Sequence, residues 1–168
     1  MSSTAKTPAW VQLLVLAVGV AVIVGGTYFF LEWQKNRPAT PLREQQVEVK
    51  NGAAEQSLTP YTVCELDAQC DGGEPPTLAL DDSSPVTVTV PREVSSSSWK
   101  LLTIYDDPAA NDEQIFQSGE ASEASVDPVK DGAQLVVAEV SQLAIDEGDG
   151  GEETPVVATW SIAFNQAG

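Results

Sequence analysis

Ser97 and Lys100 have the spacing of a known catalytic pair. They fit the S-x-x-K pattern, in which penicillin-binding enzymes place a nucleophilic serine and a lysine one helical turn apart. Here the sequence "SSSSWKLL" leads into a predicted strand, which sends alternate side chains to opposite faces, and no K-T-G follows downstream. We therefore interpret the serines as a polar loop, Trp99 as an anchor in the core and Lys100 as a solvated charge.

Two adjacent aspartate pairs, Asp81 with Asp82 and Asp106 with Asp107, are the carboxylates that a glycosidase site could use. Such a site needs a general acid in a shielded position that raises its pKa. Adjacent residues of a strand face opposite ways, and pairs of this kind arise by chance in a chain with 25 acidic residues. We expect no glycosidase activity from them.

The run "DEGDGGEE", Asp146 to Glu153, clusters the carboxylates that calcium prefers. The EF-hand pattern fails, because Gly148 and Gly150 stand two and four positions after Asp146. A solvated hairpin loop between two strands is the simpler interpretation, with calcium binding as the alternative.

Composition excludes several classes of function. The 168 residues include no histidine, so Ser-His-Asp and Cys-His catalysis cannot be built, and two cysteines alone fall short of a zinc site. Beyond Arg43, 24 acidic residues stand against four basic ones, an excess of 20 negative charges that repels phosphate backbones. The sequence predicts a protein that is not an enzyme, has no cofactor and binds no nucleic acid.

Cys64 and Cys70 lie six positions apart in "PYTVCELDAQC". Two cysteines with none left over are typical of a single disulfide in an oxidising compartment. Two unrelated buried thiols are the alternative.

The segment "WVQLLVLAVGVAVIVGGTYFF" carries no charge between Lys6 and Glu32. Its 21 residues span about 31 Å as a helix, close to the hydrocarbon thickness of a bilayer. We predict a cytoplasmic tail over residues 1–9 and a transmembrane helix over 10–33, with aromatic residues at both ends. A cleaved signal peptide is the alternative, although its apolar run is usually shorter, about 7 to 15 residues.

The orientation of this helix is ambiguous by charge. Lys35, Arg37 and Arg43 follow the helix and favour a cytoplasmic position for what comes next. Long domains cross largely regardless of nearby charge, and the cysteine pair favours export. We therefore expect a single-pass protein of the plasma membrane with its C-terminal domain outside the cytoplasm.

Ala17, Ala21 and Gly25 recur every four residues and share one face of the predicted helix. Small residues at this spacing let another helix approach closely. This face is a candidate docking surface for a membrane partner, and a chance pattern is the alternative.

After the helix, residues 34–58 predict a polar stalk, with a first strand near Val47 and Val49 and a turn at Asn51 and Gly52. Residues 59–168 predict an acidic, antiparallel, immunoglobulin-like β-sandwich, and Ala121–Val126 could form one helical turn. We predict strands near Tyr61–Leu66, Thr77–Leu80, Val86–Val90, Lys100–Tyr105, Glu113–Gln117, Gln134–Leu143 and Val156–Phe164.

Two of these strands alternate strictly. Val86, Val88 and Val90 share a face between Pro85 and Pro91, which favours an edge position. The last strand predicts the main core face: Val156, Ala158, Trp160, Ile162 and Phe164.

Residues 61–107 resemble an actinobacterial family of small envelope proteins known only as domain of unknown function 2771. The resemblance rests on Cys64 and Cys70, on "VTVTVP", and on "PREVSSSSWKLL" with Trp99. It implies an N-terminal export or anchor segment and a β-rich exterior domain, and it implies no catalytic residues.

Together these observations favour a non-enzymatic accessory or scaffold subunit of an envelope or membrane protein complex, such as a respiratory, transport or cell-wall assembly. The partners would be membrane proteins and the lipid bilayer. A ligand- or glycan-binding module anchored at the surface is the alternative, and a hydrolase is third.

Overall fold

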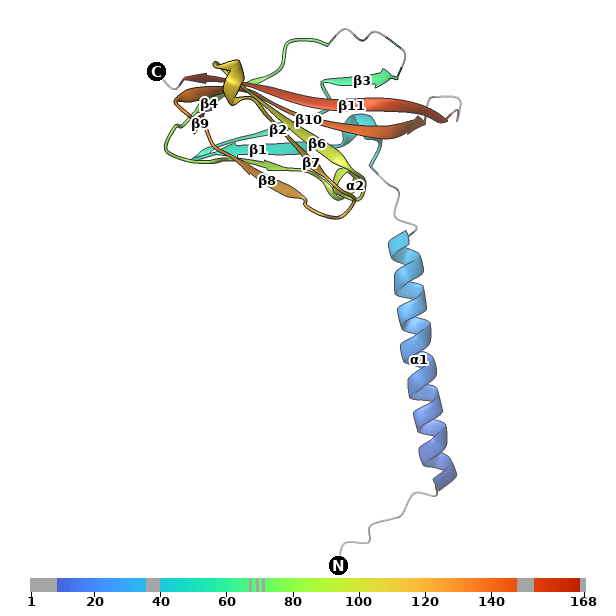
Figure 1. The fold of residues 1–168 in the computed structure, drawn as a ribbon. Helices are drawn as coiled ribbons and strands as arrows, with labels where there is room; N and C mark the ends of the chain where they lie inside the picture. The colour runs from blue at the N-terminus through green and yellow to red at the C-terminus, as the bar shows by residue number, and fades with distance from the viewer. Residues whose placement is uncertain are drawn as a thin grey trace, which may run out of the picture. The chain divides into compact units, whose positions relative to one another are not determined.

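The computed structural model describes residues 9–35, 40–66, 68, 70, 72–147 and 153–166. They form two units, an N-terminal helix and a β domain that begins at Thr40 (Figure 1).

The N-terminal unit is helix α1, Ala9–Lys35, whose described side chains are almost all exposed. Its window Leu14–Glu32 has a mean hydropathy of 2.4, which is long and apolar enough to cross a membrane. A signal sequence near an N-terminus meets the same criterion, so α1 is a membrane anchor or a signal sequence.

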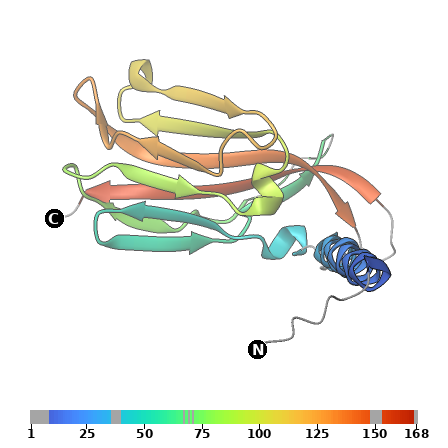
Figure 2. The same cartoon turned by 90° about the horizontal axis from the view of Figure 1, so that it is seen from below.

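The β domain consists of two sheets that pack face to face (Figures 1 and 2). The first sheet has the order β2-β1-β5-β8, with strands β1 (Val47–Asn51), β2 (Ala54–Leu58), β5 (Val86–Thr89) and β8 (Glu123–Val126). The second sheet has the order β3-β11-β10-β6-β7, with β4 on β11 and β9 on β10: β3 (Thr62–Glu65), β4 (Thr77–Leu80), β6 (Trp99–Tyr105), β7 (Asp112–Phe116), β9 (Val129–Lys130), β10 (Ala133–Glu147) and β11 (Glu153–Gln166).

Three short helices connect these strands: η1 (Leu42–Glu44), α2 (Arg92–Ser95) and η2 (Pro108–Ala110). The strands β11, β10, β6 and β7 are neighbours in that order, and they form the centre and one side of the second sheet. The predicted mainly β sandwich is therefore confirmed. One pairing departs from the antiparallel prediction, because β4 runs parallel to β11.

Alternating side chains from both sheets form one hydrophobic core. The predicted core face of β11 is confirmed, since Val156, Ala158, Trp160, Ile162 and Phe164 are all buried. Trp160 is fully buried, and its Nε1 donates to the carbonyl oxygen of Gln45 at 3.0 Å. Trp99 is 1% exposed, and its Nε1 donates to the carbonyl oxygen of Ala121 at 3.0 Å.

The β domain begins at Thr40 and not at the predicted residue 59. Most of the predicted stalk over residues 34–58 is therefore part of the folded domain. Strands β1 and β2 form a hairpin whose side chains Val47, Val49 and Leu58 enter the core. Their turn uses Gly52 at φ +58°, a conformation that costs glycine little. The predicted strand near Val47 and Val49 is confirmed as β1, and the predicted turn includes Gly52, whereas β2 was not predicted because its residues are mostly polar.

Two further predictions were wrong. Ala121–Val126 forms strand β8 rather than a helical turn, because Ala124 and Val126 alternate with exposed residues and enter the core. Strand β5 is interior rather than an edge, since it pairs with both β1 and β8. Pro85 and Pro91 flank the paired residues, so every residue within β5 keeps its N–H for the ladder.

Trp160→Ala should lower the free energy of unfolding by about 3 to 5 kcal/mol, because it leaves a cavity and removes the bond to Gln45. Chemical denaturation measures this difference. Leu143→Ala is the matched control at an exposed position and should change stability by less than about 0.5 kcal/mol. Equal effects of the two substitutions would contradict the assigned core.

Candidate partner-binding surface

The second sheet turns one face to the core and one to solvent, and the solvent face is unusually apolar. Its strand register aligns Leu102 with Glu139, Ile104 with Val137, and Leu143 with Val157. We call this the outer face, and its apolar members are Leu102, Ile104, Ile115, Val137, Leu143, Ile145 and Val157.

Three of these side chains extend far into solvent. Ile115 and Leu143 are each 61% exposed and Ile145 is 56% exposed. The others are half-buried by their neighbours. Clustered exposed apolar side chains mark binding surfaces more often than isolated ones do.

Glu139 lies within the outer face, on the central strand β10 opposite Leu102 and Ser161. It is half-buried, and this burial raises the pKa of its carboxyl group, while the positive charge of Lys100 acts in the opposite direction. The Lys100 Nζ itself lies 3.1 Å from a carboxylate oxygen of Glu113. Glu139 thus places an acceptor in apolar surroundings.

A groove of about 320 Å³ lies at the start of β6. It is lined by Ser98, Trp99, Lys100, Ile115, Ser141, Gln142, Leu143 and Val157. Gln142 is only 6% exposed, and its Oε1 has no hydrogen-bond donor among the residues that the structure describes. The Gln142 side chain lies on the core side of β10, as the side chains of Ala138 and Val140 do, so this oxygen faces the interior of the domain.

Ser97 and Lys100 are not brought together as a helical pair. Ser97 lies in the turn after α2, where its N–H donates to the carbonyl oxygen of Val94, and Lys100 lies on β6 beside Glu113. Trp99 between them is buried, so its predicted role as an anchor is confirmed.

The aspartate pairs hold turns through main-chain N–H groups. Asp81 accepts hydrogen bonds from the Ser83 hydroxyl and N–H and from the Ser84 hydroxyl, and these bonds lower its pKa. Asp106 accepts from the N–H of Gln134 at 2.8 Å, and Asp107 caps η2 by accepting from the N–H of Ala109 at 2.9 Å. The Asp82 Oδ2 accepts a hydrogen bond from the side-chain Nε2 of Gln134 at 3.5 Å.

The predicted calcium run, Asp146 to Glu153, lies partly outside the described residues, which omit 148–152. Asp146 forms an ion pair with Arg43, whose Nη2 lies 2.9 Å from the Asp146 Oδ2. Among the described residues, no cluster of three or more Cys, Asp or Glu could hold a metal ion.

Cys64 and Cys70 form the predicted disulfide at the β3 edge of the second sheet. The three small residues Ala17, Ala21 and Gly25 lie in helix α1 and are exposed.

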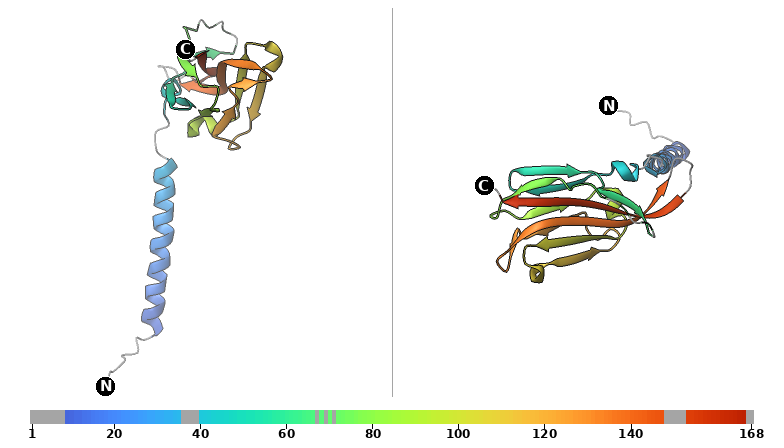
Figure 3. Two further views of the ribbon diagram at one scale, coloured as in Figure 1. Left: turned by 90° about the vertical axis from the view of Figure 1, so that its left-hand side faces the viewer. Right: turned by 90° about the horizontal axis from the view of Figure 1, so that it is seen from above.

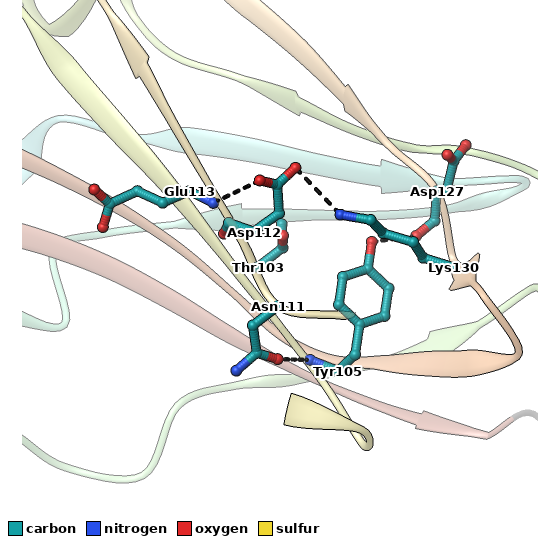
Figure 4. Close-up of polar contacts among 7 residues, drawn as sticks. All are labelled: Thr103, Tyr105, Asn111, Asp112, Glu113, Asp127 and Lys130. Atoms are coloured by element: carbon teal, nitrogen blue, oxygen red, sulfur yellow. Dashed lines mark hydrogen bonds and ion pairs between the residues drawn. The ribbon is translucent and has the colours of Figure 1, made fainter. Parts of the chain in front are cut away.

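Sequence reasoning missed a polar cluster around Tyr105 (Figure 4). The Tyr105 hydroxyl donates to the carbonyl oxygen of Asp127 at 2.8 Å, and its main-chain N–H donates to the Asn111 Oδ1. The Lys130 Nζ lies 3.4 Å from the Asp112 Oδ2 and 6.0 Å from the centre of the Tyr105 ring. Burial, followed by the charge of Asp127, raises the Tyr105 pKa.

This cluster joins the loops at the ends of β6, β8 and β9 (Figure 4). Its polar groups form hydrogen bonds and an ion pair with one another, so we interpret the cluster as structural. Its members come from separate segments between residues 103 and 130, and no local motif could have identified it.

Residues 40–165 match the profile of a family described as "Protein of unknown function (DUF2771)". The chain belongs to this family. The match begins where the β domain begins, so the DUF2771 region is the β-sandwich.

Three relatives of this DUF2771 protein are uncharacterized mycobacterial proteins, one from Mycobacterium bovis and two from strains of Mycobacterium tuberculosis. Each is 27% identical over 88 residues, or 51% of this chain and 54% of the relative. The matched part thus spans about half the length of these relatives. No solved structure matches the chain.

Because the Glu139 pKa is raised, the unfolded chain releases this proton near its ordinary value of 4.5, whereas the folded DUF2771 domain retains it to higher pH. Rising pH through this interval therefore favours unfolding at this position. Glu139→Gln should gain stability relative to wild type as pH rises from about 4 to 7.

Denaturation curves of both proteins across this pH range measure the difference. Glu123→Gln, at an exposed position, is the control for the loss of one surface charge. A Glu139→Gln difference that stays constant with pH would contradict the effect of burial.

Proposed function

We propose that this protein is a non-enzymatic accessory or scaffold subunit of a membrane protein complex in the cell envelope. In this proposal α1 anchors the chain and the outer face binds a protein partner. The observation that carries the proposal is the exposure of Ile115, Leu143 and Ile145 on one face of the second sheet. Burial of such side chains against a partner stabilises a complex by removing apolar area from water.

The proposed location is the plasma membrane, with the β domain outside the cytoplasm. The apolar helix α1 supports an anchor, and the disulfide Cys64–Cys70 supports an oxidising compartment. The face of Ala17, Ala21 and Gly25 would add close helix packing within the bilayer.

A ligand- or glycan-binding module is the alternative function, and a ligand would bind in the groove at the start of β6. Sugars commonly need an exposed ring, but Trp99 is 1% exposed and its ring stacks on Phe116 with centroids 4.2 Å apart. The exposed face therefore favours a protein partner over a glycan.

Affinity purification of the full chain from its native membrane in mild detergent tests the proposed function. We expect a stoichiometric membrane protein to co-purify. Ile115→Asp should reduce its recovery at least tenfold, because it places a charge in the apolar contact. Ser57→Asp is the matched control, since it adds the same charge at an exposed position on the other sheet.

The same purification tests the helix face. Gly25→Ile should weaken recovery of the partner, whereas Gly19→Ile, on the opposite side of α1, should not. Equal recovery from Ile115→Asp, Gly25→Ile and wild type would overturn the subunit proposal.

Location is tested by labelling Gly168→Cys in intact cells with a membrane-impermeant maleimide. The two native cysteines are joined in a disulfide and do not compete. We expect labelling without permeabilisation. Labelling that requires permeabilisation would place the domain in the cytoplasm, and a mature protein that begins after α1 would identify a cleaved signal sequence.

A further inference from the structure

Strands β10 and β11 extend beyond the strands that flank them (Figures 1 and 3). β6 pairs with β10 only as far as Gln142, and β3 pairs with β11 only as far as Val156. The hairpin continues with Leu143–Glu147 paired with Glu153–Val157, and within this part Leu143–Glu147 lies beyond β6 and Glu153–Pro155 lies beyond β3. We call these eight residues the arm.

The register of β11 shows which main-chain groups lie on each edge of the arm. The Tyr61 N–H donates to the Thr159 carbonyl, and the Ala163 N–H donates to the Pro76 carbonyl. Thr159 and Ala163 therefore direct their polar groups away from β10. Because successive residues of a strand point to opposite sides, Ala158 and the other even-numbered residues of β11 face β10.

The same alternation passes to β10 through its pairing with β11. Ala158 pairs with Gln142, so even-numbered residues of β10 bond to β11 and odd-numbered ones point to the other side. In the arm, Leu143, Ile145 and Glu147 thus direct their N–H and C=O groups to the side where β6 has ended. No described strand pairs with this edge.

The opposite edge of the arm is blocked to strand pairing. Pro155 lies opposite Ile145, and as an odd-numbered residue of β11 it occupies the edge away from β10. Proline has no N–H to donate, and natural proteins use it to prevent pairing at exposed edges. The β10 edge has no such protection along Leu143–Glu147.

The open edge begins at the groove and continues along exposed apolar side chains. Ser141 and Leu143 line the groove at the point where this edge begins. Leu143 and Ile145 then project on the outer face with exposures of 61% and 56%. An added strand would find main-chain partners and apolar neighbours along one line.

The charge of the arm indicates which kind of segment would pair with the free edge of β10. The arm carries Asp146, Glu147 and Glu153 and no basic residue. Arg43 pairs with Asp146, so Glu147 and Glu153 are the acidic residues that give the arm its net negative charge. Pairing of two copies would bring these acidic residues together, which disfavours a second copy. An extended segment in which apolar residues alternate with lysine or arginine complements both the side chains and the charge.

We propose that the free edge of β10, Leu143–Glu147, binds an extended basic and apolar segment of a partner protein by strand addition. This inference rests on the proposed function, because it specifies how the partner of the scaffold is held.

The test uses the full chain in detergent and a fluorescent peptide of alternating valine and lysine. We expect saturable binding that weakens at least tenfold when alternate peptide amides are N-methylated, because strand addition needs their N–H groups. A valine and glutamate peptide should bind at least tenfold more weakly. Equal affinity for the N-methylated peptide, which has the same charge, would overturn strand addition.

Variants locate the site. Ile145→Pro removes an edge N–H but leaves the bonds from Ala144 and Asp146 to β11, so it should abolish peptide binding while the domain stays folded. Ile145→Val is the matched control and should bind normally. Should Ile145→Pro unfold, Glu147→Lys with Glu153→Lys replaces it, and this double variant should prefer the glutamate peptide.

Amide hydrogen exchange gives an independent readout. The Leu143 and Ile145 amides should exchange quickly in the free protein and at least tenfold more slowly with the peptide, whereas the Ala144 amide is already protected. Unchanged exchange at Leu143 and Ile145 would overturn the inference. A membrane partner that still co-purifies in that case would leave the scaffold proposal intact, whereas peptide binding without any such partner would overturn the scaffold proposal alone.

Discussion

The hairpin of β10 and β11 is the constraint on which the rest of the β domain depends. Its ladder joins eleven residue pairs, from Val137 with Ala163 to Glu147 with Glu153. β6 and β9 attach to one side and β3 and β4 to the other. On its core side the Trp160 indole binds the Gln45 carbonyl, 115 residues earlier in the chain. The hairpin thus connects the start of the domain to its end.

The two faces of this hairpin have different physical tasks. Its core face is buried against the first sheet, and removal of that apolar area from water stabilises the fold. Its outer face keeps Leu143 and Ile145 in solvent, where they add little to the stability of the isolated domain. Stability and binding are therefore separable by substitution, and Trp160→Ala and Ile145→Pro should affect different measurements.

Long alternating strands were the part of the fold most accessible to sequence reasoning. β6 and β11 begin and end within three residues of their predicted bounds, and the short strand β4 matches its predicted bounds, because period-2 alternation reports burial directly. β1 and β5 were also predicted, whereas β2 was missed and β8 was misread as a possible helical turn, because few of their residues are apolar. The sequence interpretation placed the aspartate pairs on strands, whereas the structure places them in turns, where their bonds to main-chain N–H groups depend on loop geometry.

The sequence alone determined an apolar N-terminal segment, an acidic and mainly β domain, a cysteine pair and the core face of β11, because each depends on local composition or period. Only the tertiary structure decided which strands are neighbours, and hence that β5 is interior and that Leu143–Glu147 has a free edge. An edge exists where a neighbouring strand ends, and that is a relation between distant segments. No local pattern in the chain encodes it.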